Sequence, residues 1–280
     1  CQFTRRSGWP RGRSAGATAG PDDATRLARE AVAAGVDIVL GYGGDGTLNG
    51  IIQAMAGTQA SFAVWPGGTS NVIAHDLKMP FAMAKLADVI AQGRIKRIAL
   101  GVATGDRTRE QAVERQESAL PKSKRVAAKT QEPDHQPPMT DHRPPHRYFF
   151  MMAGIGLDAS IARQVNKRLK RKTGEFAYWI TGLRHLFTWD AEPFVIEVDG
   201  QAYESTFTII GNGKGYGGGL LLTPNAQLEA PHFEVWILPR QSSNFGYLRV
   251  LMACMRGKPE TTGAIMLRGH HIRANSTHTP

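Results

Sequence analysis

Two short glycine-rich loops contain the residues of this 280-residue chain that are best suited to chemistry. The first loop, Gly43-Gly44-Asp45-Gly46-Thr47, follows the apolar run 36–40 and precedes the apolar-periodic run 48–55. This order predicts a strand, a loop and a helix. Because glycine has no Cβ, the backbone of such a loop can approach a phosphate closely, and the N–H groups that open the next helix attract the same anion. The loop therefore predicts phosphate binding, although a plain tight turn has the same glycine pattern.

A second loop of similar composition, Pro66-Gly67-Gly68-Thr69-Ser70-Asn71, follows a predicted strand at 61–65 and precedes a predicted helix at 72–77. Two successive strand-loop-helix units place both loops at the carboxyl ends of parallel strands, where open α/β sheets bind ligands. Thr47 and Thr69 would add hydroxyl donors, and Asp45 would place a carboxylate where a nucleotide-bound metal could sit. We therefore interpret the two loops as one polyphosphate site.

The pair of loops, each extended into its helix as far as Asn49 and Ala74, resembles the catalytic domain of diacylglycerol kinases. The chain is most similar to the bacterial lipid kinase branch, which is related to sphingosine and ceramide kinases. The resemblance continues through shorter matching segments at 154–159, 172–174, 217–220 and 224–226. It implies a kinase that uses ATP and Mg²⁺ and transfers the γ-phosphoryl group to a lipid hydroxyl. It also implies an α/β N-terminal domain with a parallel, nucleotide-binding sheet, followed by a mainly-β sandwich domain with inserted helices.

The resemblance assigns Asp45 as the catalytic residue that acts through Mg²⁺. The expected nucleotide-binding residues come from three segments: Thr18, Gly43, Gly44, Asp45, Gly46, Thr47, Asn49, Gly67, Gly68, Thr69 and Asn71. The family's general base is a glutamate in an Asp-Gly-Glu motif near the C-terminus, and no such motif precedes Pro280. We therefore expect the base to be absent from this chain, and the chain to be inactive or nearly so. Ala230-Pro231 replaces the family's structural metal motif, with Glu229 as a weak substitute, so no metal ligand is assigned there.

The expected organisation is an N-terminally incomplete α/β domain at 1–103, a disordered linker or insert at 104–147 and a C-terminally incomplete sandwich domain at 148–280. The insert is rich in proline and charge and poor in large apolar residues, which leaves it unable to bury a core. Predicted helices lie at 22–34, 81–92, 157–171 and 244–255. Predicted strands lie at 94–102, 148–153, 220–222, 233–238 and 265–272, with a hairpin at 194–210 around Asp199-Gly200.

Composition sets limits on partners and location. The formal net charge of +10 favours anionic partners; we expect a lipid substrate at a membrane surface and no nucleic acid. Two cysteines give no disulfide framework, and no apolar run is long enough to span a membrane. We therefore expect a cytoplasmic protein that contacts the membrane peripherally. The basic segment 163–172 could bind anionic headgroups or be an ordinary solvated helix face.

Two alternatives remain open. NAD kinases share the Gly-Gly-Asp-Gly-Thr loop, so a soluble small-molecule kinase is one of them. The other is a non-catalytic nucleotide- or lipid-binding remnant, which the expected lack of a base favours.

Overall fold

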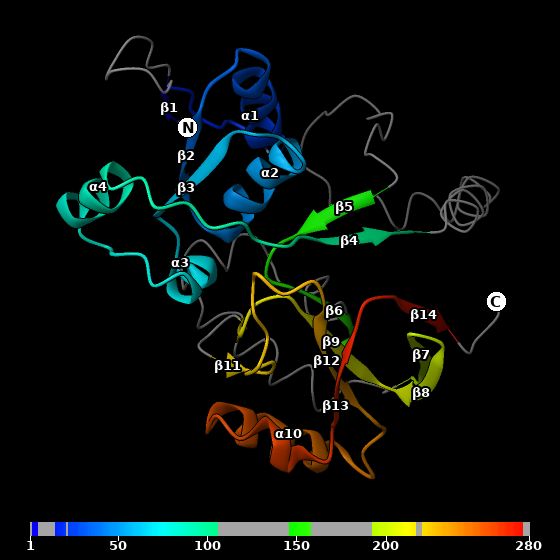
Figure 1. The fold of residues 1–280 in the computed structure, drawn as a ribbon. Coiled ribbons are helices and arrows are strands. Elements are labelled where there is room, and N and C mark those ends of the chain that lie inside the picture. Colours follow the sequence, from blue (N-terminus) through cyan, green and yellow to red (C-terminus); the bar gives the residue numbers. More distant parts are fainter. Residues whose placement is uncertain are drawn as a thin grey trace, which may run out of the picture. The chain divides into compact units, whose positions relative to one another are not determined.

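The structure, a computed structural model, describes residues 2–4, 15–20, 22–105, 146–157, 192–216 and 220–276. Strands and helices alternate in the first half of the chain (Figure 1). After a first short strand, the elements are α1 (Asp23–Ala33), β2 (Ile38–Gly43), α2 (Asp45–Met55), β3 (Ser61–Pro66), α3 (Val72–Asp76) and α4 (Met83–Ala91). The helices and strands predicted between residues 22 and 92 are all present, with ends that differ by at most three residues.

Strands β2 and β3 pair in parallel, in register from Ile38 opposite Ser61 to Gly43 opposite Pro66. This confirms the parallel arrangement on which a shared site of the two loops depends. On its other side, β2 pairs in antiparallel fashion with β1 (Gln2–Thr4), which was not predicted. That strand satisfies backbone groups of β2 that would otherwise form a sheet edge.

Small residues allow α1 and α2 to pack closely. Ala24 and Ala28 of α1 are fully buried, and a Cβ added at Gly50 of α2 would lie 3.0 Å from the Cβ of Ala24. The hydroxyl of Thr25 donates to the carbonyl oxygen of Gly50 at 2.8 Å. Because α2 directly follows the first glycine loop, this packing fixes the position of that loop.

The second half of the chain is mainly β structure, as predicted. One antiparallel sheet has the order β13-β12-β9-β6, and another has the order β14-β7-β8. Their bounds are β6 (Met152–Gly156), β7 (Phe194–Val198), β8 (Gln201–Ser205), β9 (Phe207–Gly211), β12 (Phe233–Leu238), β13 (Ile265–Gly269) and β14 (Ile272–Ser276). A short pair, β10 (Gly215–Tyr216) and β11 (Leu220–Leu221), and helix α10 (Asn244–Met255) complete this half.

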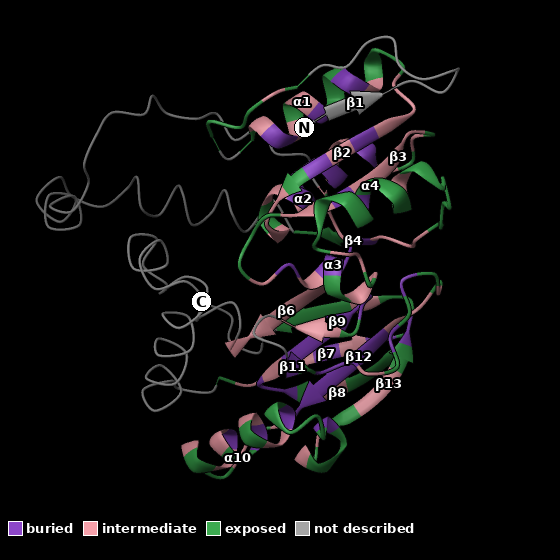
Figure 2. Cartoon of the chain, turned by 90° about the vertical axis from the view of Figure 1, so that its left-hand side faces the viewer, coloured by how far each residue is buried: buried purple, intermediate pink, exposed green. Residues whose placement is uncertain are grey.

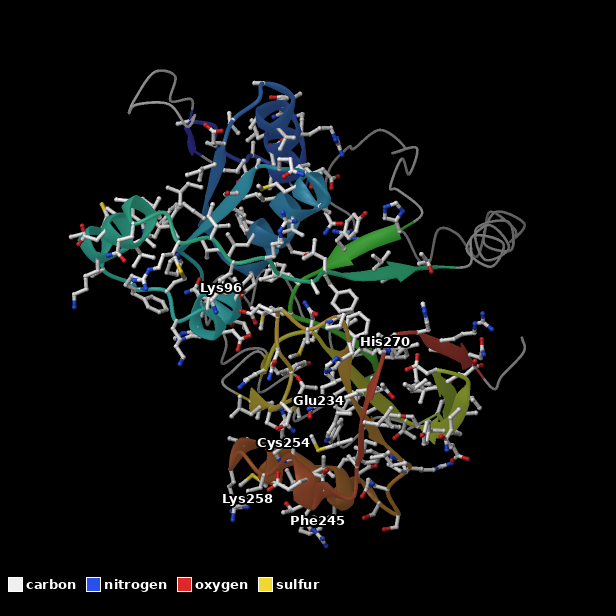
Figure 3. The ribbon with its side chains drawn as sticks, viewed as in Figure 1. Lys96, Glu234, Phe245, Cys254, Lys258 and His270 are labelled. Atoms are coloured by element: carbon white, nitrogen blue, oxygen red, sulfur yellow. The ribbon has the colours of Figure 1, made fainter. Side chains whose placement is uncertain are left out.

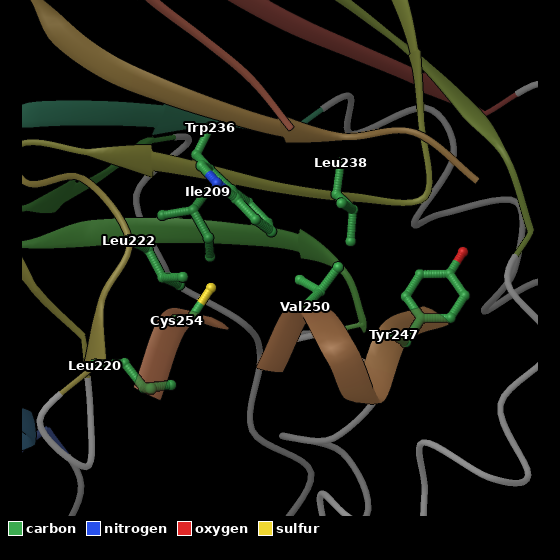
Figure 4. Packing of buried hydrophobic residues seen from close by; sticks show 8 residues of the cluster. All are labelled: Ile209, Leu220, Leu222, Trp236, Leu238, Tyr247, Val250 and Cys254. Carbon is green, nitrogen blue, oxygen red and sulfur yellow. The ribbon is translucent and has the colours of Figure 1, made fainter. Parts of the chain in front are cut away.

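Strand β12 is buried on both faces from Glu234 to Leu238 (Figure 2). Val235 and Ile237 belong to a core cluster with residues of β7, so this core lies between the two sheets. Trp236 and Leu238 point to the opposite face and pack on α10 (Figure 4). This arrangement confirms the sandwich, with a helix covering the outer face of one sheet.

Several strand predictions were wrong in extent, because backbone and side-chain groups distant in sequence bind the backbone there. The second arm of the hairpin predicted at 194–210 is divided between β8 and β9, which belong to different sheets. The segment predicted as a strand at 94–102 is extended only in β4 (Gly101–Thr104), which pairs with β5 (His146–Phe149). Before β4, the N–H of Ala99 donates instead to the carbonyl oxygen of Leu228. The strand predicted at 148–153 is divided between β5 and β6, where Asn212 donates to the carbonyl oxygen of Phe150.

The predicted insert at 104–147 is bounded by these same strands, so its first and last residues are β structure rather than disordered. The remainder of the insert, 106–145, lies outside the described residues. The helix predicted at 157–171 lies outside them as well, except for Leu157.

The strand predicted at 265–272 is also divided, and it turns a corner between β13 and β14 that the carboxylate of Asp199 holds. The carboxylate accepts the N–H of His271 at 2.8 Å and the N–H of His270 at 3.1 Å. Asp199 and Gly200 have positive φ angles of 48° and 89°, as a two-residue hairpin turn requires. The hydrogen bonds from His271 and His270 lower the pKa of the Asp199 carboxyl.

This corner gives a testable dependence of stability on pH. Since the folded pKa is depressed, the contribution of Asp199 is present above its unfolded pKa of about 3.9 and is lost as the pH falls through the folded value. We expect Asp199→Ala to lower the melting temperature more at neutral pH than in strong acid, where only the cost of alanine at a positive φ remains. Asp199→Asn should retain most of the stability, because asparagine still accepts a hydrogen bond and tolerates positive φ. Equal melting temperatures for all three proteins at neutral pH would contradict this role.

Candidate nucleotide site

The two predicted loops are in direct backbone contact. The N–H of Gly67 donates to the carbonyl oxygen of Gly43 at 3.0 Å, which extends the parallel pairing of β2 and β3 into the loops. A Cβ added at Gly44 would lie 3.2 Å from the Cα of Gly68, and a Cβ added at Gly68 would collide with the Cα of Gly44. The structure therefore joins the loops into one continuous surface.

Asn71 shapes the second loop. Its backbone is left-handed, with φ 45° and ψ 45°, a conformation that asparagine adopts more readily than most residues. Its side-chain oxygen accepts the N–H of Gly68 at 2.8 Å, while its amide nitrogen donates to the carbonyl oxygen of Gly68 at 2.7 Å. The side chain is almost fully buried, so these two bonds hold Gly68 in position.

Asp45 connects the first loop to the second unit. It opens α2, and its Oδ1 accepts the backbone N–H of Ile73 at 3.3 Å. Ile73 lies in the first turn of α3, where N–H groups have no partner within the helix. The Asp45 carboxylate therefore lies beside the N-termini of both α2 and α3, within reach of a cation bound there.

The beginning of α2 has the properties of an anion site. Gly44 is its N-cap residue and provides no side-chain cap, so the N–H groups of the first turn are available to a ligand. The partial positive charge of the helix N-terminus adds to their attraction. Gly67, Gly68 and Thr69 of the second loop are exposed beside it.

The remaining predicted site residues have different surroundings. Gly46 is exposed, with open space where a Cβ would stand, whereas the Thr47 side chain lies beneath Gly43. Asn49 is half-buried, and its carbonyl oxygen accepts from Gln53. Thr18 is exposed in the stretch before α1, and within the described residues it forms no hydrogen bond with either loop. The structure thus brings together the residues of both loops but does not add Thr18 to them.

An aromatic pair beside the loops was missed in the sequence. Tyr42 and Trp65 occupy paired positions at the ends of β2 and β3, with ring centroids 5.0 Å apart in an edge-to-face arrangement. The Tyr42 ring also lies against the Cα of Gly67, so that a Cβ there would lie 2.6 Å from it. Although Tyr42 is 60% exposed, its place immediately before Gly43 could have indicated it.

Two carboxyl groups link the first half of the chain to the second. Oδ2 of Asp76, the last residue of α3, accepts the backbone N–H of Lys214 at 3.4 Å, and burial raises the pKa of this carboxyl. Glu229, considered above as a weak metal ligand, instead forms an ion pair of 2.9 Å with Lys96. The described residues contain no cluster of three or more His, Cys, Asp or Glu suited to a metal. A Mg²⁺ ion at Asp45 would therefore depend on phosphate oxygens and water for its other ligands.

The contact between the loops predicts that an added methyl group has different effects on stability at two glycines, one in each loop. Gly68→Ala should force the loops apart and lower the free energy of unfolding by about 1–3 kcal/mol, the usual effect of overpacking. Gly46→Ala is the matched control, because its Cβ would meet open space and helix α2 gains from alanine. Urea unfolding of both variants measures the difference. If Gly68→Ala is as stable as Gly46→Ala, the loops do not constrain each other.

Comparison with known proteins agrees with this geometry. Residues 13–103 match the diacylglycerol kinase catalytic domain, and residues 152–279 match the YegS C-terminal NAD kinase beta sandwich-like domain. A Mycobacterium tuberculosis protein named diacylglycerol kinase is 28% identical over 208 residues, which cover 73% of this chain and 55% of that protein. A Pseudomonas putida protein named "Probable lipid kinase YegS-like" is 30% identical over 237 residues, which cover 82% of this chain and 65% of that protein.

A crystal structure of a diacylglycerol kinase from Bacillus anthracis has the same fold. It has a TM-score of 0.61 and 19% sequence identity, and the match covers 93% of this chain and 74% of that one. The chain spans between about half and two thirds of the length of the two curated relatives named above. With both parts matched, the chain is similar to the diacylglycerol kinase catalytic domain at 13–103 and to the sandwich-like domain of the YegS type at 152–279.

Proposed function

We propose that this chain binds ATP with Mg²⁺ at the two glycine loops and acts in the transfer of the γ-phosphoryl group to the hydroxyl of a diacylglycerol-like lipid. The observation that supports this most directly is the backbone contact between Gly44 and Gly68, which joins the two loops into one continuous backbone surface. The relatives named as diacylglycerol and lipid kinases support the class of substrate.

Phosphoryl transfer requires alignment of the reacting groups and neutralisation of charge more than covalent chemistry. The N–H groups at the start of α2 would bind phosphate oxygens, and the Thr69 hydroxyl would donate to the same chain of phosphates. Asp45 would hold Mg²⁺, which when bound supplies positive charge between phosphate oxygens. Asn71 would act indirectly, because it holds Gly68 and therefore sets where Thr69 stands.

The aromatic pair gives the proposed nucleotide a place for its base. The Tyr42 ring is mostly exposed and rests on the second loop, so it is close to any phosphate bound there. Aromatic side chains stack on nucleobases with little regard to sequence. We therefore assign the base to the Tyr42 side of the loops.

Nucleotide binding can be tested by calorimetric titration of the chain with ATP and Mg²⁺. Thr69→Ala should weaken binding by about 1.5–3 kcal/mol, the value of one hydrogen bond to a charged group. Asp45→Asn should reduce the benefit of Mg²⁺, since a neutral amide is a poorer Mg²⁺ ligand. Thr104→Ala, an exposed threonine on β4, is the control. Equal affinity in all four proteins would exclude the loops from the site.

The place of the base can be tested separately with inorganic tripolyphosphate, which has phosphates but no base. Tyr42→Ala should weaken ATP binding by about 1–3 kcal/mol and leave tripolyphosphate binding unchanged, whereas Tyr42→Phe should preserve both. A loss of both ligands in Tyr42→Ala would show that the tyrosine only supports the loop.

The reaction itself is tested by incubating the chain with labelled ATP and diacylglycerol in mixed micelles. Transfer to the lipid that Asp45→Ala abolishes would support the proposal. Labelling of NAD without labelling of lipid would favour the soluble kinase. Nucleotide binding without transfer to either acceptor would favour the non-catalytic remnant.

A further inference from the structure

Helix α10 has two faces of different chemistry. Tyr247, Val250 and Cys254, at intervals of three and four residues, pack on the outer face of the four-stranded sheet (Figure 4). Phe245 and Arg249 begin a second stripe, which continues through Met252 and Arg256 at intervals of four, three and four residues. Since these intervals return to one side of a helix, the second stripe lies opposite the first.

The outer stripe combines exposed apolar and cationic side chains. Phe245 is 68% exposed and Met255, on the flank of the stripe, is 54% exposed. In Figure 3, Phe245 and Lys258 point away from the sheets, whereas Cys254 points toward them. We call this surface the α10 face. It consists of three exposed apolar residues and three exposed cations: Phe245, Met252, Met255, Arg249, Arg256 and Lys258.

The charge of the α10 face has one sign. The sequence has no Asp or Glu between Val235 and Pro259. The nearest acidic residue that follows is Glu260, in the 3-10 turn Pro259–Thr262, which packs on the helix. By contrast, α4 also exposes Met83 and a lysine, but it contains Asp88. Exposed apolar groups together with three cations, and no acidic residue within the helix itself, therefore distinguish α10 from α4.

The helix is fixed with this face outward. The Tyr247 hydroxyl forms a hydrogen bond of 2.9 Å with the Thr206 hydroxyl in the sandwich. At its start, the Ser243 hydroxyl accepts the N–H of Gly246 at 3.4 Å and caps the helix. The α10 face therefore cannot turn inward to bury its apolar side chains without loss of these contacts and of the core packing.

We propose that the α10 face docks the protein on the surface of an anionic lipid bilayer. The proposal rests on the proposed function in one respect: a kinase for diacylglycerol-like lipids meets its acceptor in a membrane. Arg and Lys attract anionic headgroups, and their long stems let the charge stay at headgroup level while the apolar part lies deeper. Phe245 and the methionines would enter the boundary between headgroups and acyl chains, as apolar residues of interfacial helices do. In the described part of the chain no helix is long and apolar enough to cross a bilayer.

The test is co-sedimentation of the full chain with vesicles of phosphatidylcholine alone and with vesicles of equal parts phosphatidylcholine and phosphatidylglycerol. We expect binding to the anionic vesicles that weakens with added salt. The double variant Arg249→Gln/Arg256→Gln should lower the partition coefficient by about 20–30-fold, at about fivefold for each cation. Phe245→Ser/Met252→Ser should lower it by about tenfold or more.

The matched control is Met83→Ser/Lys85→Gln on α4, which changes residues of the same classes at exposed positions. It should bind anionic vesicles like the unchanged chain. Circular dichroism of each variant verifies the fold, and titration with ATP and Mg²⁺ follows the proposed nucleotide site independently. Vesicle binding without any nucleotide binding would support the α10 face while contradicting the proposed function.

Three results would overturn the inference: equal vesicle binding by the arginine double variant and the unchanged chain, equal losses in the α10 and α4 variants, or no binding to anionic vesicles at all. Light scattering tests the competing occupant, a second copy of the chain. Dimers that Phe245→Ser/Met252→Ser abolishes, without vesicle binding, would assign the α10 face to self-association instead.

Discussion

The approach of two glycine backbones, at Gly44 and Gly68, is the constraint on which the nucleotide half of this chain depends. Parallel pairing of β2 and β3 brings the two strand ends to the same edge, and the Gly67 to Gly43 hydrogen bond continues that pairing into the loops. Any Cβ at Gly68 would collide with Gly44. Packing therefore requires glycine here independently of any ligand. The fold therefore leaves this backbone surface bare of side chains whether or not a ligand binds. The proposed phosphate site uses the same surface.

The polar residues of the loops have structural contacts of their own. Asn71 uses its amide group to hold Gly68, and Asp45 accepts an N–H from the first turn of α3. A cation at Asp45 would therefore compete with, or share, an interaction that connects the two strand-loop-helix units. Binding of a nucleotide with Mg²⁺ and the relative position of the loops are then coupled, because the same carboxylate takes part in both.

Local signals were sufficient to predict much of the fold, and non-local contacts account for most of what was missed. Glycine loops, the Asp199-Gly200 turn and the 244–255 helix were correct because each depends on neighbouring residues. The divided strands were not, because Asn212 and Asp199 bind backbone groups far away in sequence. The pairing of Tyr42 with Trp65 could not be predicted for the same reason, because it depends on the register of two strands. Which residues bind nucleotide stays a prediction, since the structure shows how the loops are built and not what they bind.

The same packing that completes the sandwich determines what α10 presents outside. Because β12 is apolar on both sides, Trp236 and Leu238 need a cover, and Tyr247, Val250 and Cys254 provide it. Burial in this core raises the pKa of the Cys254 thiol to about 11, as expected for a residue used in packing. A helix fixed by three inner residues at helical spacing cannot rotate, so the stripe on its other side is exposed by necessity. A helix with polar residues on that outer stripe would cover β12 equally well. The apolar and cationic residues found there are therefore not explained by the fold, which is the reason to seek their explanation in what the protein binds.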